Sequence, residues 1–248
     1  MKIVAVIPAR YQSSRFQGKP LVDIQGKIMV ERVFLQAKKV KEFDEVIVAT
    51  DDQRIYEACL GRNINVMMTS DKHPTGTDRI GEIALKIPAD LYVNIQGDEP
   101  LIEPETIRKV IEPFLKEGKN PNGIQVVNLM TIIDNPTDLI NPTVPKVIAS
   151  KDGRGIYLTR AVAPFPKGSI NVTYYKQVCV YAYTPEALRF FCESPRGKIE
   201  SIEDIEILRF IEAGYKVQYL DVKSETIAID TPNDLEKVIQ YMKEQQIS

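Results

Sequence analysis

The sequence predicts an α/β fold in which a mostly parallel, doubly wound sheet is covered by helices on both faces. Through the first half of the chain, short apolar runs rich in β-branched residues alternate with amphipathic segments. This alternation is typical of a parallel sheet with crossover helices. The chain has 248 residues, of which 44% are hydrophobic. That is enough for one large domain with a substantial core.

Four strands are expected in the first half, and helical patterns separate them. The expected strands comprise residues 3–7, 45–50, 65–68 and 91–95. Two of the separating segments carry apolar residues at i, i+3, i+4 and i+7, starting from Val30 and from Ile80. Because parallel strands joined by right-handed crossovers end at the same edge, their carboxyl ends should line one crevice. We therefore expect the functional residues in the loops that follow strands.

The second half, from about residue 121, is richer in strand-like runs. These runs cover residues 125–133, 145–149, 155–160 and 177–183. A Glu-rich helix is expected over residues 201–212, followed by a strand at 226–230 and a closing helix that Thr231 and Pro232 begin. We interpret residues 1–248 as a single domain, in which roughly residues 121–200 contain a smaller β-rich lobe.

Composition narrows the classes of function. Lys and Arg number 32 against 34 Asp and Glu, a formal net charge of -2, so no overall basic field is available to hold a nucleic-acid backbone. Arg10 and Arg15 stand where a signal peptide would have small residues, and no apolar stretch approaches the roughly 18 residues of a membrane span. We expect a cytoplasmic protein with neither a nucleic-acid nor a membrane partner.

Cysteine and histidine usage argues against thiol or zinc chemistry. Cys59, Cys179 and Cys192 lie far apart without a CxxC pair, and His73 is the only histidine. A catalytic thiol needs a nearby base, so the cysteines are better interpreted as small apolar residues. His73 precedes Pro74 without a visible orienting carboxylate, which favours a peripheral role over that of a general base.

The loop after the first expected strand concentrates three cations and two serine hydroxyl groups. Its functional side chains are Arg10, Ser13, Ser14, Arg15 and Lys19. Arginine forks, a lysine point charge and hydroxyl donors together suit a polyphosphate. Pro20 follows Lys19 where a Walker A loop has Ser or Thr, and no GxGxxG is present. The alternative is a solvated basic loop, but the position at a strand's carboxyl end favours phosphate binding.

Two aspartates follow strand-like runs and could hold a divalent cation. Asp98 comes just after residues 91–95, and Asp230 ends the run 226–230. Each also has a structural explanation, Asp98 as a cap before Pro100 and Asp230 as the N-cap of the closing helix. Magnesium takes few protein carboxylates and completes its octahedron with phosphate oxygens and water.

The motifs together resemble those of the 3-deoxy-manno-octulosonate cytidylyltransferases, or CMP-Kdo synthetases. The first loop matches the sugar-nucleotidyltransferase signature xxPARxxSxRxxGKxL in full. Further matches follow in the family's order: ATD at 49–51, TGTDR at 75–79, NIQGDEP at 94–100 and IDTPNDL at 229–235. The resemblance covers essentially the whole chain. It implies a nucleotide-diphospho-sugar transferase fold of the glycosyltransferase-A type.

The resemblance also implies the reaction and its residues. CMP passes from CTP to the anomeric hydroxyl of 3-deoxy-D-manno-octulosonate (Kdo), an acidic eight-carbon sugar, and pyrophosphate leaves, a step of lipopolysaccharide biosynthesis. Asp98 and Asp230 are implied as Mg2+ ligands, and these two with Arg10 and Lys19 as the catalytic set. The implied CTP-binding residues are Pro8, Ala9, Arg10, Ser13, Ser14, Arg15, Lys19, Thr75, Gly76, Thr77, Arg79 and Gln96.

For the sugar acid, the resemblance implies a second group of residues. It comprises Gln96, Arg160, Gln177, Tyr181, Glu203 and Asp204. Arg160 is a suitable bidentate partner for the substrate carboxylate, with a surface ion pair as the alternative. The family usually has His where Gln177 stands and an amide where Asp204 stands. Both residues can still hydrogen-bond hydroxyl groups, but the exchanges leave open a preference for an amino or deoxy variant of the sugar.

Two rival functions differ in testable features. CMP-sialate synthetases share the first loop and the chemistry, but the QGDEP stretch favours Kdo. A non-catalytic nucleotide-binding regulator on the same fold would be expected to lack Lys19, Asp98 or Asp230, and all three are present. Family members are typically homodimers, and the strand carrying Tyr181 and Tyr183 is the expected partner surface.

Overall fold

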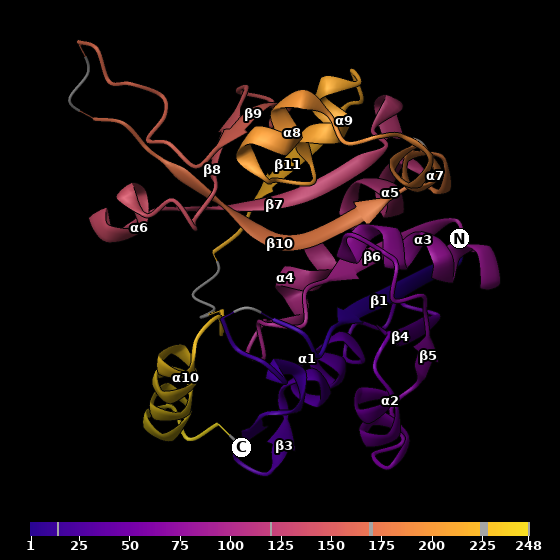
Figure 1. The fold of residues 1–248 in the computed structure, drawn as a ribbon. Helices are drawn as coiled ribbons and strands as arrows, with labels where there is room; N and C mark the ends of the chain where they lie inside the picture. Colours follow the sequence, from indigo (N-terminus) through magenta and orange to yellow (C-terminus); the bar gives the residue numbers. More distant parts are fainter. Residues whose placement is uncertain (14, 120, 169–170, 224–227, 248) are drawn as a thin grey trace.

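One large sheet organises the molecule (Figure 1). A computed structural model describes residues 1–13, 15–119, 121–168, 171–223 and 228–247. In these residues the sheet runs in the order β11-β7-β10-β6-β1-β4-β5, and β8 and β9 attach beside β10. Its strands are β1 Ile3–Ala9, β4 Glu45–Thr50, β5 Val66–Met68, β6 Leu91–Ile95, β7 Val126–Ile132, β8 Lys146–Ala149, β9 Gly155–Thr159, β10 Tyr175–Tyr183 and β11 Val217–Asp221.

The strands β6, β1, β4 and β5 pair in parallel, as the sequence predicted. Strands β4 and β6 have the expected bounds, and β1 continues two residues beyond the expected end, to Ala9. Most of their side chains are buried, because helices cover both faces and leave no solvent side that would require polar alternation.

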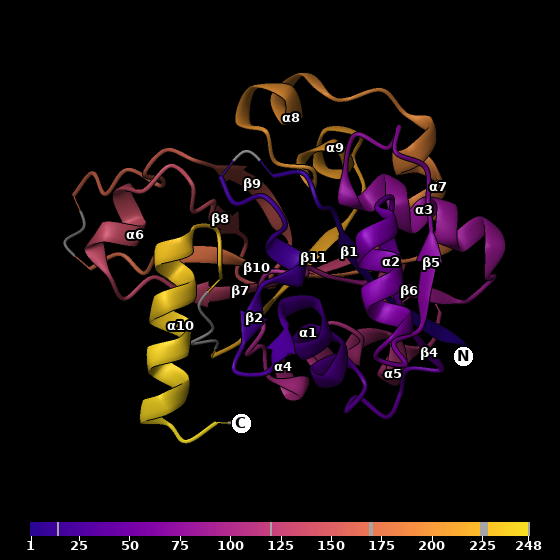
Figure 2. The same ribbon diagram turned by 60° about the horizontal axis from the view of Figure 1, so that its bottom comes forward.

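Helices pack on the two faces as a doubly wound fold requires (Figure 2). One face contacts α1, α2, α4 and α5, and the other contacts α3, α7 and α9. The helices are α1 Met29–Ala37, α2 Gln53–Leu60, α3 Gly76–Lys86, α4 Pro104–Lys109, α5 Glu112–Glu117, α6 Pro136–Ile140, α7 Pro185–Glu193, α8 Lys198–Glu203, α9 Leu208–Glu212 and α10 Pro232–Glu244. The apolar stripes predicted from Val30 and Ile80 are buried in α1 and α3.

The closing helix α10 packs on the N-terminal part of the chain (Figures 1 and 2). Val238 and Met242 of α10 form a small core with Ile24 and Met29. Ile24 belongs to the short hairpin of β2 Asp23–Ile24 and β3 Lys27–Ile28. This packing fixes the start of α10, and therefore Asp230, next to the loop after β1.

The β-rich second half joins the same sheet. Strand β10 is antiparallel to both β6 and β7, and β11 pairs in parallel with β7. The hairpin of β8 and β9 lies off this path, and β9 packs beside α9 and β11, whereas α6 lies at the edge of the molecule (Figure 1). The four strands predicted between residues 125 and 183 are all present, within two residues at each end.

Three sequence expectations need correction. The single helix expected over residues 201–212 is two helices, because Asp204 adopts the left-handed conformation (φ 52°) and ends α8. Strand β11 was missed, although Gly214 and the alternation of polar and apolar residues over 216–219 are strand signals. In the strand expected at 226–230, residues 226 and 227 lie outside the described residues, and residues 228–230 form no regular secondary structure.

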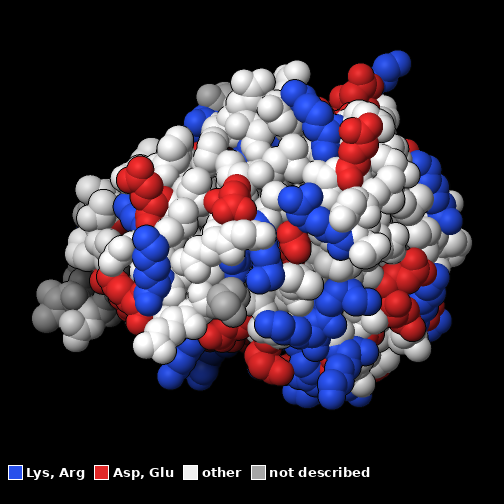
Figure 3. Space-filling model, turned by 90° about the horizontal axis from the view of Figure 1, so that it is seen from below, with Lys and Arg blue, Asp and Glu red and all other residues white. Residues whose placement is uncertain are grey.

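The surface view in Figure 3 shows acidic and basic side chains interspersed over the displayed face. This mixture agrees with the formal net charge of -2. Among the described helices, none has both the length and the apolarity that crossing a membrane demands.

Candidate active site

A cleft of about 360 Å³ opens at the carboxyl ends of β1 and β6. These neighbouring parallel strands end at Ala9 and Ile95, so the loops that follow them meet. The lining residues are Pro8, Ala9, Arg10, Gln12, Ser13, Arg15, Lys19, Pro20, Met29, Pro74, Thr75, Gly76, Gln96, Gly97, Asp98 and Glu206. Most residues predicted to bind the nucleotide therefore share one cavity.

The loop after β1 folds back on itself before Lys19. The Gly18 amide donates to the Tyr11 carbonyl at 2.8 Å, and Gly18 has a positive φ of 72° that favours glycine. Pro20 then stands in the first turn of a short 3-10 helix, Lys19–Leu21. Ser13 Oγ accepts from the Phe16 amide at 3.3 Å. The remaining predicted residue of this loop, Ser14, lies outside the described residues.

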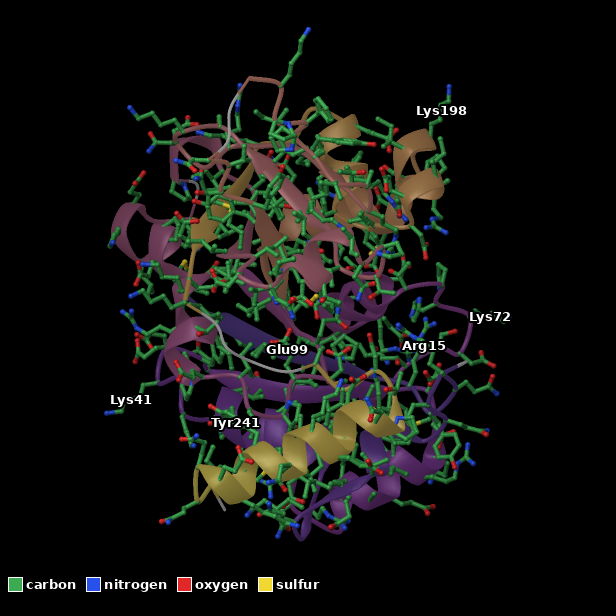
Figure 4. All side chains as sticks on the ribbon, turned by 90° about the vertical axis from the view of Figure 1, so that its left-hand side faces the viewer. Arg15, Lys41, Lys72, Glu99, Lys198 and Tyr241 are labelled. Atoms are coloured by element: carbon green, nitrogen blue, oxygen red, sulfur yellow. The ribbon has the colours of Figure 1, made fainter. Side chains whose placement is uncertain are left out.

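The side chain of Lys19 brings the two predicted aspartates together. Lys19 Nζ lies 3.3 Å from Asp98 Oδ2 and 3.3 Å from Asp230 Oδ1. Arg15 Nη2 is also 3.1 Å from Asp230 Oδ1, and Figure 4 shows Arg15 beside one end of α10. Both carboxylates thus face one point at the mouth of the cleft, although they are far apart in the sequence.

Neither Asp98 nor Asp230 is a helix cap, the structural function considered for each from the sequence. Thr231, and not Asp230, caps α10: its hydroxyl accepts from the Asp234 amide, and the Asp234 side chain accepts in return from the Thr231 amide. Asp98 caps no helix either, because the next helix, α4, starts at Pro104 with Glu103 as its N-cap. Neither carboxylate is therefore needed to begin a helix.

The pair fits a hard divalent cation. Two carboxylates within reach of one point, on the rim of a cationic cleft, match magnesium, which uses few protein ligands and completes its shell with phosphate and water oxygens. In the described part of the chain, no cluster of three or more His, Cys, Asp or Glu side chains could hold a metal by itself. Substrate oxygens would have to supply the remaining ligands.

Arg10 connects the first loop to the loop before α3. Its guanidinium donates to the His73 carbonyl, and Nη2 lies 3.5 Å from the Thr75 carbonyl. The buried Nε has no protein partner in the described structure. Arg10 thus fixes the Thr75 wall of the cleft.

Backbone at Gly76 and Gly97 forms a narrow part of the cleft. A Cβ at Gly76 would contact the Pro8 ring at 3.5 Å, and a Cβ at Gly97 would approach the Pro8 carbonyl at 3.2 Å. Thr75 is the N-cap of α3, with its hydroxyl accepting from the Asp78 amide at 3.3 Å. The cap interpretation of Thr75 is therefore correct, and the cap also places Thr75 in the cleft.

Arg79 is not where the nucleotide-binding prediction requires it. Its side chain is fully buried, its Nη2 pairs with Asp51 at 2.7 Å, and it donates to Thr69 Oγ1. It lies outside the lining of the cleft. Because Arg79 follows Thr77 by two helical positions, its side chain points toward β4 and β5 and supports the fold there.

Glu206 lines the cleft and was missed by sequence reasoning. Thr77 Oγ1 donates to Glu206 Oε2 at 2.5 Å. Burial raises the pKa of the Glu206 carboxyl, and hydrogen bonds from Thr77 and Thr75 oppose that shift. The sequence carries one signal for Glu206, an acidic residue between Ile205 and Ile207. The structure shows that both isoleucines are buried.

Glu203 and Asp204, the acidic pair predicted to bind the sugar, do not line this cleft. Glu203 accepts from Tyr157 Oη at 3.1 Å, Thr159 Oγ1 at 2.7 Å and the Arg160 amide at 2.9 Å. The Asp204 carboxylate pairs with Arg196 at 2.7 Å. The left-handed turn at Asp204 shifts the cleft-facing acid three residues beyond Glu203, to Glu206.

Arg160 donates to backbone carbonyls instead of an acidic side chain. Its guanidinium donates to the carbonyls of Glu203 at 2.5 Å, Pro142 at 2.9 Å and Asp204 at 2.9 Å. The buried Lys146 adds a second link, because its Nζ donates to the Arg160 carbonyl at 2.9 Å. The surface ion-pair alternative is thus wrong, and this fork joins β9 to the end of α8.

We expect Arg160→Ala to lower the free energy of unfolding by about 1–3 kcal/mol, because it leaves three carbonyls without their donor. The KM for the sugar should rise as well, since the end of α8 leads directly to Glu206. Urea unfolding and steady-state kinetics measure the two effects. Arg189→Ala, which removes an exposed arginine of α7, is the control. A raised sugar KM at unchanged stability would show instead that Arg160 acts on the substrate directly.

Gln177 and Tyr181 lie on β10 behind the cleft. Gln177 Nε2 donates to Asn128 Oδ1 at 2.9 Å, and the Asn128 amide donates to the carbonyls of Val178 and Val180. These carbonyls flank an irregularity in the pairing of β10 with β7. Gln177 therefore stabilises a bulge in β10. This bulge lies next to Gln96, because the backbone amide of Gln96 donates to the Cys179 carbonyl at 3.3 Å.

The two tyrosines expected at a partner surface pack against the hydrophobic core of the sheet. Tyr181 and Tyr183 stack with ring centroids 6.0 Å apart, and Tyr183 is buried against Phe210. Burial raises the pKa of Tyr181 well above its usual range. Tyr183 is therefore a core residue, and Tyr181 is partly buried beside it.

His73 has an orienting carboxylate that the sequence did not reveal. Its Nε2 lies 2.6 Å from Glu82 Oε2, and Glu82 also accepts from the Ser70 amide and from Lys86. These contacts hold the pKa of Glu82 at about 2 against the opposing effect of burial. His73 reaches the cleft only through its carbonyl, which accepts from Arg10.

The parallel sheet, the cationic loop at its carboxyl edge and the two converging aspartates define a nucleotidyltransferase. A sequence model of the cytidylyltransferase family matches residues 4–227. The chain belongs to this family.

Full-length relatives agree with this assignment to the cytidylyltransferase family. The 3-deoxy-manno-octulosonate cytidylyltransferase of Fusobacterium nucleatum subsp. nucleatum is 40% identical over 248 residues, covering 100% of this chain and 99% of the relative. That of Geobacter sulfurreducens is 40% identical over 254 residues, covering 98% and 100%. A solved structure of CMP:2-keto-3-deoxy-manno-octonic acid synthetase complexed with CTP has a TM-score of 0.92 and 35% identity, covering 99% of this chain and 100% of that one.

Proposed function

We propose that this chain transfers CMP from CTP to the anomeric hydroxyl of Kdo and releases pyrophosphate. The observation that carries the proposal is the meeting of Lys19, Asp98 and Asp230 at the mouth of the cleft. Full-length relatives with this activity in their names support the choice of substrates. The sugar hydroxyl oxygen forms a bond to the α-phosphorus while the bond from that phosphorus to the β-phosphate oxygen breaks. The hydroxyl proton passes to solvent.

The residues of the chain act mainly by position and charge. Arg15 and Lys19 neutralise the negative charge that grows on the leaving pyrophosphate, and Arg10 lines the cleft and holds its Thr75 wall. Gly76 and Gly97 let the base approach the backbone beside Pro8 and Gln96. An amide side chain and backbone groups there can read the N4 donor and the O2 and N3 acceptors of cytosine.

Asp98 and Asp230 would hold magnesium, which, when bound, neutralises charge on the α-phosphate and lowers the pKa of the attacking hydroxyl. The two carboxylates provide the anionic side of that site. In the protein alone, Lys19 supplies the neutralising charge between them.

Glu206 is the acidic side chain placed to bind sugar hydroxyl groups. It lines the cleft, accepts from Thr77 Oγ1 and lies near Tyr181. The differences from the family pattern at Gln177 and Asp204 lie outside the cleft lining, so we infer that they alter sugar preference at most indirectly.

We expect Glu206→Gln to raise the KM for Kdo about tenfold, because a charged acceptor becomes neutral, while the KM for CTP changes little. Stability should not fall at pH 8. Burial raises the pKa of this carboxyl in the folded state, so ionisation costs stability once the pH rises above the unfolded value, and Gln removes that cost. Thermal unfolding of the wild type and Glu206→Gln at pH 5 and pH 8 checks the sign of the stability change. A stability loss at pH 8 would contradict this account.

The rival substrate is N-acetylneuraminate. Pyrophosphate release is measured with CTP and Mg2+ after adding Kdo or N-acetylneuraminate to parallel samples. Release with Kdo and little with N-acetylneuraminate is the expected result. Release only with N-acetylneuraminate would identify a sialate enzyme, and release with neither would favour a nucleotide-binding regulator.

We further propose that the protein works as a cytoplasmic homodimer in lipopolysaccharide biosynthesis. Exposed apolar side chains at Ile132, Ile140, Val162 and Phe165 support a partner surface around β7, α6 and the segment after β9. Light scattering of the wild type and of a variant with Phe165→Glu and Ile140→Glu tests this surface.

A further inference from the structure

An aromatic side chain outside the cleft closes the cationic loop at its base. Tyr11 begins the turn that Gly18 ends, joined by the hydrogen bond from the Gly18 amide to the Tyr11 carbonyl. The hydroxyl end of the Tyr11 ring also contacts Gly18, where a Cβ would lie 3.2 Å from the ring. Lys19 follows directly. The position of this ring therefore determines where the Lys19 side chain begins.

A cation from another element covers the same ring. The Arg54 guanidinium lies 3.3 Å from the centroid of the Tyr11 ring. Arg54 stands in the first turn of α2, and Asp52, the N-cap of that helix, holds it through contacts at 3.0 Å and 2.6 Å. The two contacts with one carboxylate thus hold the guanidinium over the Tyr11 ring, where a cation-π interaction is favourable.

We propose that Arg54 is a positioning residue for the triphosphate-binding loop and acts through the Tyr11 ring. This inference rests on the proposed reaction for its kinetic consequence only. Neither Arg54 nor Tyr11 is among the described residues that line the cleft, so neither is assigned a contact with substrate. Arg54 holds Tyr11, Tyr11 packs on Gly18, and Gly18 sets Lys19 between Asp98 and Asp230.

The chain offers a matched control just beyond the same helix. Arg62 follows the end of α2, pairs with Glu31 at 3.2 Å and touches neither Tyr11 nor the cleft. Arg62→Ala changes net charge as Arg54→Ala does. Tyr11→Phe is a second control, because it keeps the ring face that Arg54 covers.

The kinetic test is a double-mutant cycle on kcat/KM for CTP. We expect Arg54→Ala to lower kcat/KM about fivefold and Tyr11→Leu about tenfold, with the double variant no worse than Tyr11→Leu alone. Arg54→Lys should recover part of the loss, while Arg62→Ala and Tyr11→Phe should match the wild type. Additive losses would show that Arg54 acts on the nucleotide directly and would overturn the proposal.

A second measurement needs no substrate. Trypsin can cut the loop after Arg15, whereas Pro20 blocks cleavage after Lys19. We expect cleavage after Arg15 to be several-fold faster in Arg54→Ala than in Arg62→Ala. Equal cleavage rates would overturn the proposal even if Tyr11→Leu failed to fold. An inactive wild type with faster cleavage in Arg54→Ala would instead reject the proposed reaction and keep the positioning function.

Discussion

Asp98→Asn and Asp230→Asn are each expected to remain folded while losing turnover by about 100-fold or more. Magnesium, a hard cation, binds a neutral amide oxygen less well than a carboxylate. The structure explains why the fold should survive. Thr231 caps α10 without help from Asp230, and the ion pairs of the two aspartates with Lys19 are partly exposed, with 27% and 36% of the aspartate side chains accessible.

Kinetics at varied magnesium concentration, together with thermal unfolding, check this prediction. Each single variant should need more magnesium, and the double variant should be little worse than either single one, because residues that serve one ion act as a unit. Thr231→Ala is the control for a helix cap: it should lower the free energy of unfolding by about 1 kcal/mol, because α10 loses its cap, and leave the magnesium requirement unchanged. Near-normal turnover at low magnesium in either variant would remove that aspartate from the metal site.

Lys19→Ala is expected to lower kcat by about 100-fold or more while CTP binding weakens much less. The ammonium group meets charge that grows on the leaving pyrophosphate, so its effect is largest in the transition state. Its position between Asp98 and Asp230 adds a second expectation. Without the ammonium, the two carboxylates lose a competitor for the metal, so the magnesium requirement should not rise.

Single-turnover kinetics and equilibrium CTP binding separate these effects. Lys19→Arg keeps the charge but not the compact geometry, and it should recover only part of the rate. An unchanged kcat would exclude Lys19 from the chemistry. A raised magnesium requirement in Lys19→Ala would show that the lysine supports the metal site and does not act on the leaving group.

Local pattern determined most of the fold and the first loop. Residues 45–50 and 91–95 are strands with the predicted bounds because continuous burial on both faces selects β-branched runs. Arg15, Lys19, Thr75 and Asp98 meet in one cleft because parallel strands end at one edge. These conclusions needed only short-range periodicity and the handedness of crossovers.

Tertiary structure alone decided which acid of this segment faces the cleft. One left-handed residue, Asp204, divides the expected helix and turns Glu206 toward Thr77 while Glu203 faces β9. It also decided that the donors of Arg160 meet backbone carbonyls and that Arg79 is buried beside Asp51. A sequence specifies which donors a side chain carries, but its partners depend on the three-dimensional path of distant segments, which no local periodicity contains.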